Sequence, residues 1–198
     1  MKVLIVMSGV DFEAFGLRTS LELFGARVFL LPVGRPKHFL DALAGRSGFP
    51  EPDAVILSGH GDGGAFLMPE LADFLYEPDE PRGPLGPEDL SGKIALGEKI
   101  IVSTGCDTGF PQTAAVFAEA GCFYAAPADS PEGSVAYFWT VRFFYGLLFC
   151  GMSPSEAAKA ASSTDAECAQ FVWRDGRTPK NNPRKIRRFP CICPGPVL

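Results

Sequence analysis

Two short segments place reactive side chains directly after runs of apolar residues. Residues 54–61 read AVILSGHG, so His60 follows the first run between two glycines. Residues 100–109 read IIVSTGCDTG, so Cys106 follows the second run. A cysteine attacks as its thiolate, and a neighbouring imidazole promotes ionisation of the thiol and then protonates the leaving group. The pair therefore predicts a cysteine hydrolase with Cys106 and His60 as its catalytic residues.

Such a hydrolase also needs hydrogen-bond donors for the oxygen of the reacting carbonyl. Backbone N–H groups reach that oxygen where glycines leave room. We expect the amides of Gly61 and Cys106 to form this oxyanion hole. Asp107 and Asp129, near the ends of two expected strands, are candidates to bind a basic substrate residue, although capping a turn or helix is the ordinary role of such aspartates.

The remaining cysteines and the second histidine have structural interpretations. Cys122, Cys150 and Cys168 fall in expected strand or helix interiors, and buried cysteine is common as a small apolar residue. His38 lies in a weakly amphipathic segment far from any glycine-rich turn, and we expect it at the surface. These four residues are therefore left out of the candidate site.

The sequence gives no support for a metal or cofactor. Cys191 and Cys193 form a C-x-C pair, but a structural zinc site needs four ligands and no CxxC or histidine cluster completes this one. Neither a GxGxxG after the first strand nor a phosphate-binding GxxxxGK[ST] loop occurs. Residues 61–64, GDGG, contain no lysine and are interpreted as a flexible rim of the active site.

Apolar runs and helical periodicity predict alternating strands and helices. Expected strands cover residues 2–7, 26–33, 54–57, 99–102, 122–126 and 170–173. Expected helices cover a segment that ends before Gly25 and residues 36–44, 113–119, 131–150 and 153–161, with a short helix at 69–75 in an otherwise irregular stretch. This alternation predicts an α/β fold with a mainly parallel sheet of about six strands, covered on both faces. In such sheets, ligands bind and catalytic residues lie beyond the carboxyl ends of the strands.

Length and charge set the domain organisation. The chain has 198 residues and a formal net charge of −5, which fits one α/β domain and argues against a nucleic-acid binder. We expect this domain over residues 1–175 and a basic, proline-containing tail over residues 176–198. Counted from Arg174, the last residues carry a charge of +6, whereas the remainder carries −11.

A membrane location is not expected. Residues 135–152 are nearly as long and apolar as a spanning helix, but Arg142 lies at the middle, which favours a buried core helix. The apolar run at the N-terminus is too short for a signal peptide. We therefore expect a cytoplasmic protein with cysteines present as thiols.

The two blocks AVILSGHG and IIVSTGCDTG resemble the His-Gly and Cys blocks of the caspase-like (clan CD) cysteine peptidases, and most closely those of CHAT domains. The likeness continues through FAEAGCFYAAPAD, VAYFWTVRFFYGLL, CGMSPSEAAKAA and QFVWRDG, and covers about residues 53–176. It implies a three-layer αβα sandwich and hydrolysis of a peptide or protein substrate, with His60 as general acid and base and Cys106 as nucleophile. Gly105 stands where many members have alanine, and Thr104 where metacaspase-like relatives carry an acid.

Two other interpretations remain open. The opening KVLIVMSGVDFEAFGL and DAVILSGHGDGG also resemble the class I glutamine amidotransferase-like superfamily, in which Cys106 would be the nucleophile and Glu13 its neighbour. That family places its cysteine in a sharp elbow, usually before histidine or glycine, whereas Asp107 follows here. Alternatively, the domain is a non-catalytic scaffold or signalling module, or it needs a protein partner to order residues 61–92.

Overall fold

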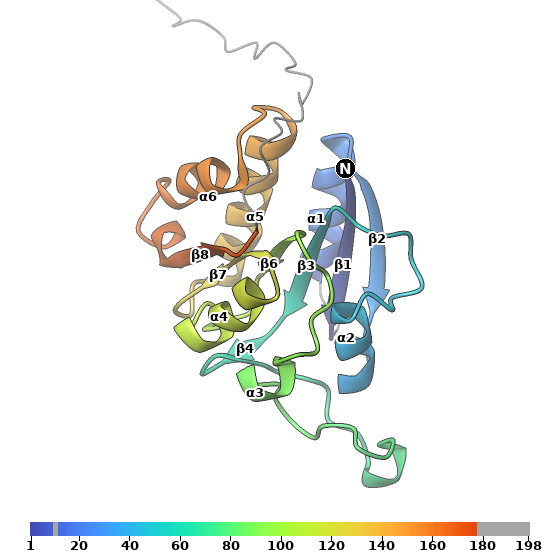
Figure 1. Cartoon of the computed structure of the whole chain (residues 1–198). Coiled ribbons are helices and arrows are strands. Elements are labelled where there is room, and N and C mark those ends of the chain that lie inside the picture. The colour runs from blue at the N-terminus through green and yellow to red at the C-terminus, as the bar shows by residue number, and fades with distance from the viewer. Residues whose placement is uncertain (10–11, 178–198) are drawn as a thin grey trace, which may run out of the picture.

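A six-stranded sheet forms the centre of the protein, in the order β2-β1-β3-β6-β7-β8 (Figure 1). The computed structural model describes residues 1–9 and 12–177. The strands are β1 Lys2–Ser8, β2 Arg27–Pro32, β3 Ala54–Gly59, β6 Ile100–Ser103, β7 Phe123–Pro127 and β8 Phe171–Asp175. All neighbours pair in parallel except β8, which runs antiparallel to β7. The expected six-stranded, mainly parallel sheet is confirmed.

Helices cover both faces of this sheet and complete three layers. One face packs on α1 Phe12–Leu23, α5 Gly133–Leu148 and α6 Pro154–Ser162; the other packs on α2 Pro36–Leu43, α3 Pro87–Leu90 and α4 Pro111–Glu119. Along β1, Val3, Ile5 and Met7 join the first core, whereas Leu4 and Val6 join the second. This alternation follows from the two-residue period of a strand and explains why these strands are continuously apolar in sequence.

The glycine-rich segment after β3 forms a hairpin, so the expectation of a flexible rim is wrong. Its strands are β4 Gly61–Asp62 and β5 Ala65–Phe66. Gly63 and Gly64 have φ values of +54° and +86°, the left-handed pair that a two-residue type I′ turn requires. Two consecutive glycines therefore serve to reverse the chain tightly rather than to leave it free.

The aromatic helix α5 belongs to the interior, as expected, although it is shorter than residues 131–150. Trp139, Phe143 and Phe144 are fully buried, and the Trp139 ring stacks on Phe171 of β8 at 4.3 Å between centroids. None of the described helices has the length and apolar character needed to cross a membrane. The expectation that Cys150 lies in a helix interior is wrong, because the residue lies beyond the end of α5 and is half-buried.

The segment 69–75 differs from expectation, and most of the predicted tail lies outside the residues that the structure describes. The helix expected over residues 69–75 is reduced to a 3-10 turn, Asp73–Leu75, and the short α3 was not expected. A second 3-10 turn, Cys168–Gln170, leads into β8. The predicted basic tail, residues 176–198, falls outside the described residues from position 178 onward.

A buried carboxylate ties the long connection between β5 and α3 to the start of α2. The Glu80 side chain is fully buried and accepts hydrogen bonds from the guanidinium of Arg35, from the amide of Lys37 at 2.9 Å and from the amide of Glu77 at 3.0 Å. Arg35 also donates to the carbonyl of Leu75 at 2.8 Å. These hydrogen bonds, that from Arg35 above all, lower the pKa of Glu80 to about 2.

We expect Glu80→Gln to destabilise the protein in a pH-dependent way. The carboxyl has a pKa of about 2 in the folded state against 4.5 ordinarily, so its stabilisation is complete above pH 4.5 and is lost as the pH falls towards 2. The difference in free energy of unfolding between wild type and Glu80→Gln, measured by urea titration, should be constant above pH 4.5 and shrink below it. The exposed Glu70→Gln serves as control. A difference that grows on acidification would contradict this role.

Candidate active site

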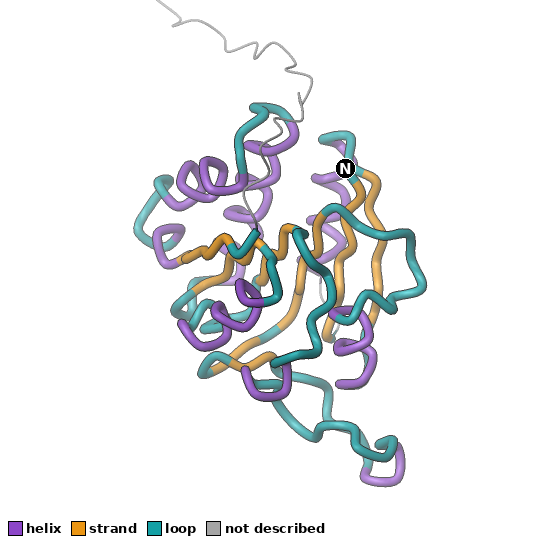
Figure 2. Tube along the Cα trace, viewed as in Figure 1, coloured by secondary structure: helices purple, strands orange, loops and turns teal. Residues whose placement is uncertain are grey.

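His60 and Cys106 follow neighbouring parallel strands at the same edge of the sheet. Leu57 of β3 pairs with Ser103 of β6, so the two chains leave the sheet side by side. His60 is exposed and Cys106 is half-buried. The hairpin β4–β5 continues from the end of β3 (Figure 2). The structure therefore brings the two predicted catalytic segments together at the expected edge.

The backbones of these two segments lie in direct contact. A Cβ atom added at Gly61 would lie 2.3 Å from the carbonyl oxygen of Cys106, and one added at Gly105 would lie 3.2 Å from both the amide nitrogen of Gly61 and the carbonyl carbon of His60. A side chain at Gly61 would push the segments apart, whereas a Cβ at Gly105 would need the neighbouring atoms to shift by a few tenths of an ångström. Glycine at position 61 is therefore a steric requirement of the juxtaposition, and glycine at position 105 relieves a tight contact.

The reactive groups themselves are not engaged elsewhere in the protein. Within residues 1–9 and 12–177, the imidazole of His60 and the thiol of Cys106 form no hydrogen bond, either with each other or with a third group. The backbone amide of Cys106 likewise donates to no acceptor in the described protein. An unpaired amide beside a thiol is what an oxyanion donor requires, and catalytic hydrogen bonds commonly tighten only when substrate binds. The catalytic and oxyanion roles stay predictions.

A buried hydrogen-bond network fixes the loop that carries Cys106. The hydroxyl of Thr108 lies 2.7 Å from the carbonyl oxygen of Gly105 and 2.8 Å from the hydroxyl of Ser103, which also accepts from the amide of Gly105. Tyr124 of β7 donates its hydroxyl proton to the carbonyl of Thr108 at 2.9 Å. Burial raises the pKa of Tyr124, which keeps this donor protonated.

Ser103, Thr108 and Tyr124 support the cysteine loop but are not among the residues predicted from the sequence. The signal for the first two was present, because they are the hydroxyl residues on either side of the TGCD turn. Tyr124 carried no such signal, since it lies in an apolar strand and its contact with Thr108 spans 16 residues.

The two candidate substrate-binding aspartates lie in adjacent turns beside Cys106. The amide of Asp107 donates to the carbonyl of Asp129 at 3.1 Å, and the Asp107 carboxylate accepts from the amide of Gly63 at the hairpin tip at 3.3 Å. Asp129 is exposed and accepts from the amide of Ser130 at 2.8 Å. Both carboxylates therefore make turn contacts, and Asp107 links the cysteine loop to the hairpin. Their binding of substrate stays a prediction.

Cys122, Cys168 and His38 have the expected structural positions, whereas Cys150 does not. Cys122 and Cys168 are buried, and desolvation raises the pKa of each thiol to about 11. His38 is exposed on α2. No group of three potential ligands that could hold a metal ion occurs among residues 1–9 and 12–177, and Cys191 and Cys193 lie outside this part.

The geometry differs from the sharp elbow associated with the amidotransferase interpretation. Asp107 has a left-handed φ of +60°, whereas Cys106 does not, and α4 begins only at Pro111. Glu13, the expected neighbour of the thiol in that interpretation, accepts a hydrogen bond from the hydroxyl of Ser58 on β3 at 3.5 Å. The cysteine thus sits in an open turn between strand and helix rather than in a strained elbow.

The sequence matches no protein-family profile and no curated protein sequence. The structure is similar to that of the Arg-specific cysteine proteinase gingipain R, with a TM-score of 0.53 and 13% sequence identity. The similarity covers 85% of this chain but 44% of that proteinase, so this chain corresponds to less than half of its length. At this identity, the comparison supports the caspase-like fold and leaves the activity to be argued from the site.

We predict that Gly61→Ala separates the hairpin from the cysteine loop. The added Cβ would lie 2.3 Å from the Cys106 carbonyl oxygen and 2.6 Å from Cγ2 of Thr108, so a backbone must move. We expect a loss of about 1–3 kcal/mol of stability and faster hydrogen exchange in residues 103–110. Gly34→Ala is the control, because its Cβ would meet no atom within 4 Å. Equal stability and exchange in Gly61→Ala and wild type would show that the contact is not needed.

Proposed function

We propose that the protein is a caspase-like cysteine peptidase that cleaves peptide bonds through a Cys106 thioester, and that its closest relatives are CHAT domains. The observation that carries this proposal is the backbone contact between the His60–Gly61 and Gly105–Cys106 segments at one sheet edge. A cysteine and a histidine carried by adjoining segments, beside an unpaired amide, have the parts of an acyl-transfer site. The similarity of the fold to a cysteine proteinase supports the same conclusion.

The residues divide the reaction between them in the ordinary way of a thiol hydrolase. His60 accepts the proton of the Cys106 thiol, and the thiolate attacks the scissile carbonyl. The amides of Cys106 and Gly61 stabilise the negative oxygen. His60 then protonates the leaving amine, which departs and leaves a thioester. Finally, His60 takes a proton from water, the hydroxide displaces the thiolate, and a carboxylic acid is released.

The charges around the site favour a basic residue on the amino side of the scissile bond. Asp107 follows Cys106 directly, and its amide donates to the backbone carbonyl of Asp129, so both aspartates lie near the turn that carries Cys106. An arginine or lysine side chain next to the scissile bond would complement them. The proteinase with the similar fold is described as Arg-specific, in keeping with this assignment. The substrate is then a peptide or protein that presents an exposed basic residue.

The proposal also covers the location of the protein and its partners. We place its activity in the cytoplasm, without a metal or organic cofactor, a nucleic acid or a membrane as partner. A protein partner that repositions residues 67–84 would be the activating partner, because this connection continues directly from the hairpin: the amide of Leu67 donates to the carbonyl of His60 at 3.0 Å. Movement of this connection would reach His60 through that bond.

The proposal is tested with a peptide library in which the residue before the scissile bond varies. Wild type should cleave peptides with arginine or lysine there, as read by mass spectrometry. Cys106→Ala and His60→Ala should each lower the cleavage rate by about a thousandfold or more. Cleavage that persists in Cys106→Ala would contradict the assignment of the nucleophile. An intact protein that cleaves no library member would favour the scaffold interpretation.

Asp107→Asn refines the same experiment. Asparagine keeps an acceptor for the Gly63 amide but removes the negative charge, so the loop should stay in place while the preference for a basic residue falls about tenfold. Glu119→Gln, an exposed change on α4, should leave the preference unaltered. An unchanged preference in Asp107→Asn and in Asp129→Asn would remove both residues from substrate recognition.

A further inference from the structure

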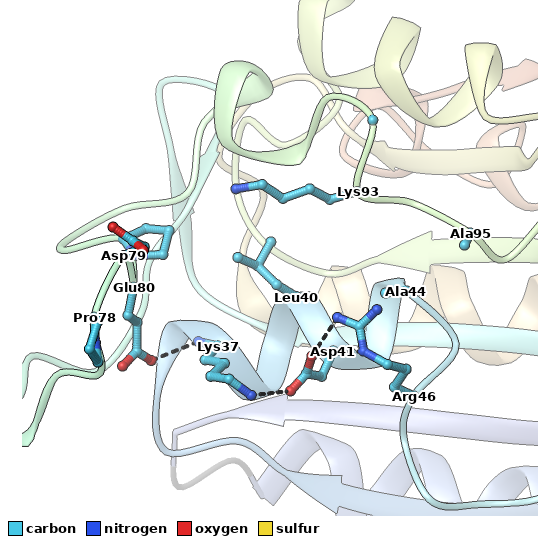
Figure 3. Close-up of a pocket in the computed structure, with 12 residues that line it drawn as sticks. Lys37, Leu40, Asp41, Ala44, Arg46, Pro78, Asp79, Glu80, Lys93 and Ala95 are labelled. Carbon is cyan, nitrogen blue, oxygen red and sulfur yellow. Dashed lines mark hydrogen bonds and ion pairs between the residues drawn. The ribbon is translucent and has the colours of Figure 1, made fainter.

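A pocket lies on the α2 face of the protein, and none of its lining residues belongs to the surroundings of Cys106 (Figure 3). Its volume is about 410 Å³, within the range of pockets that bind small molecules. One wall is α2, the second is the connection through residues 78–81, and the third is the segment 92–95 that leads to β6.

Hydrogen bonds attach the second and third walls to the two ends of α2. Glu80 fixes the second wall to the start of α2 through the amide of Lys37. Ala95 fixes the third wall to the end of α2, because its amide donates to the carbonyl of Leu43 at 2.9 Å. Pro78 and Pro81 flank the second wall and restrict its backbone. The pocket is therefore formed before any ligand binds.

Most charged groups that line the pocket are already paired. Asp41 binds Lys37 at 2.9 Å and Arg46 at 2.6 Å. Glu80 binds Arg35. These ion pairs neutralise the charged side chains near the two ends of α2, so few of the charges that line the pocket remain for a ligand to neutralise.

Two charged groups of opposite sign have no partner in the described protein. Neither the carboxylate of Asp79 nor the ammonium group of Lys93 makes a hydrogen bond or an ion pair there, and they form no pair with each other. Figure 3 shows both side chains at the pocket, on different walls, and Leu40 of α2 beside Lys93. A free anion, a free cation and an apolar floor are thus presented to the same space.

We propose that this pocket binds a zwitterion, namely a short peptide with free termini. Its ammonium group would pair with Asp79, its carboxylate with Lys93, and its apolar side chain would cover Leu40. A phosphate or another simple anion fits less well, because the lining residues comprise three acids (Asp41, Asp79, Glu80) and three bases (Lys37, Arg46, Lys93). The site is separate from the chemistry of Cys106 and does not depend on it.

The test uses the dipeptide Leu-Ala with free termini, its N-acetylated form and its C-terminal amide. Binding to the full chain is measured by isothermal titration calorimetry in a Cys106→Ala background, which prevents hydrolysis. We expect the free dipeptide to bind, and acetylation or amidation to weaken binding by about fivefold each, the effect of one partly exposed ion pair. Absence of binding, or equal affinity for all three peptides, overturns the proposal.

Two variants assign each terminus to its partner. In Asp79→Asn, the free and acetylated dipeptides should bind equally, because the partner of the ammonium group is gone. In Lys93→Gln, the free and amidated dipeptides should bind equally. Lys159→Gln on α6 is the control and should preserve both differences. If both differences persist in Asp79→Asn and Lys93→Gln, the dipeptide binds elsewhere and the assignment is wrong.

Discussion

The candidate site depends on one steric constraint, the close approach of two backbones at the carboxyl edge of the sheet. The segment after β3 and the segment after β6 touch through Gly61 and Gly105; a Cβ atom would clash at Gly61 and would fit only tightly at Gly105. Parallel pairing of β3 with β6 brings the two segments to the same height, but glycine allows them to meet. Without this contact, the segments that carry His60 and Cys106 would share an edge of the sheet but would not adjoin.

Hydrogen bonds to the cysteine loop and to the hairpin tip preserve this contact. Thr108 and Tyr124 hold the cysteine loop against β7. The Asp107 carboxylate and the Thr113 hydroxyl bind the hairpin tip, through the amide of Gly63 and the carbonyl of Gly64. Hydrogen bonds of this kind contribute about 1 kcal/mol each, and buried partners left unpaired would cost more. The network therefore makes the open arrangement of hairpin and loop the stable one, with the Cys106 amide left available.

The sequence predicted the features that arise from local patterns. Apolar runs located the six strands, and the helix expected over residues 153–161 is α6, which begins at a capping box formed by Ser153 and Glu156. Gly63 and Gly64 were misjudged because the same dipeptide suits a loose loop or a type I′ turn, and only the pairing of β4 with β5 decides between them. The pocket could not be foreseen, because it depends on how a buried Glu80 places a loop against α2. Contacts between residues far apart in the chain leave no repeating pattern in the sequence from which they could be predicted.

The central claim is that His60 activates Cys106, and selective alkylation tests it most directly. The intact protein is treated with a small excess of iodoacetamide at pH 6 to 7, and the adducts on all six cysteines are mapped by peptide mass spectrometry. An activated thiol reacts faster than an ordinary cysteine, whose pKa is about 8.5. The account predicts dominant labelling of Cys106 that falls to the level of the other cysteines in His60→Ala. Labelling spread over several cysteines and unchanged by His60→Ala would contradict it.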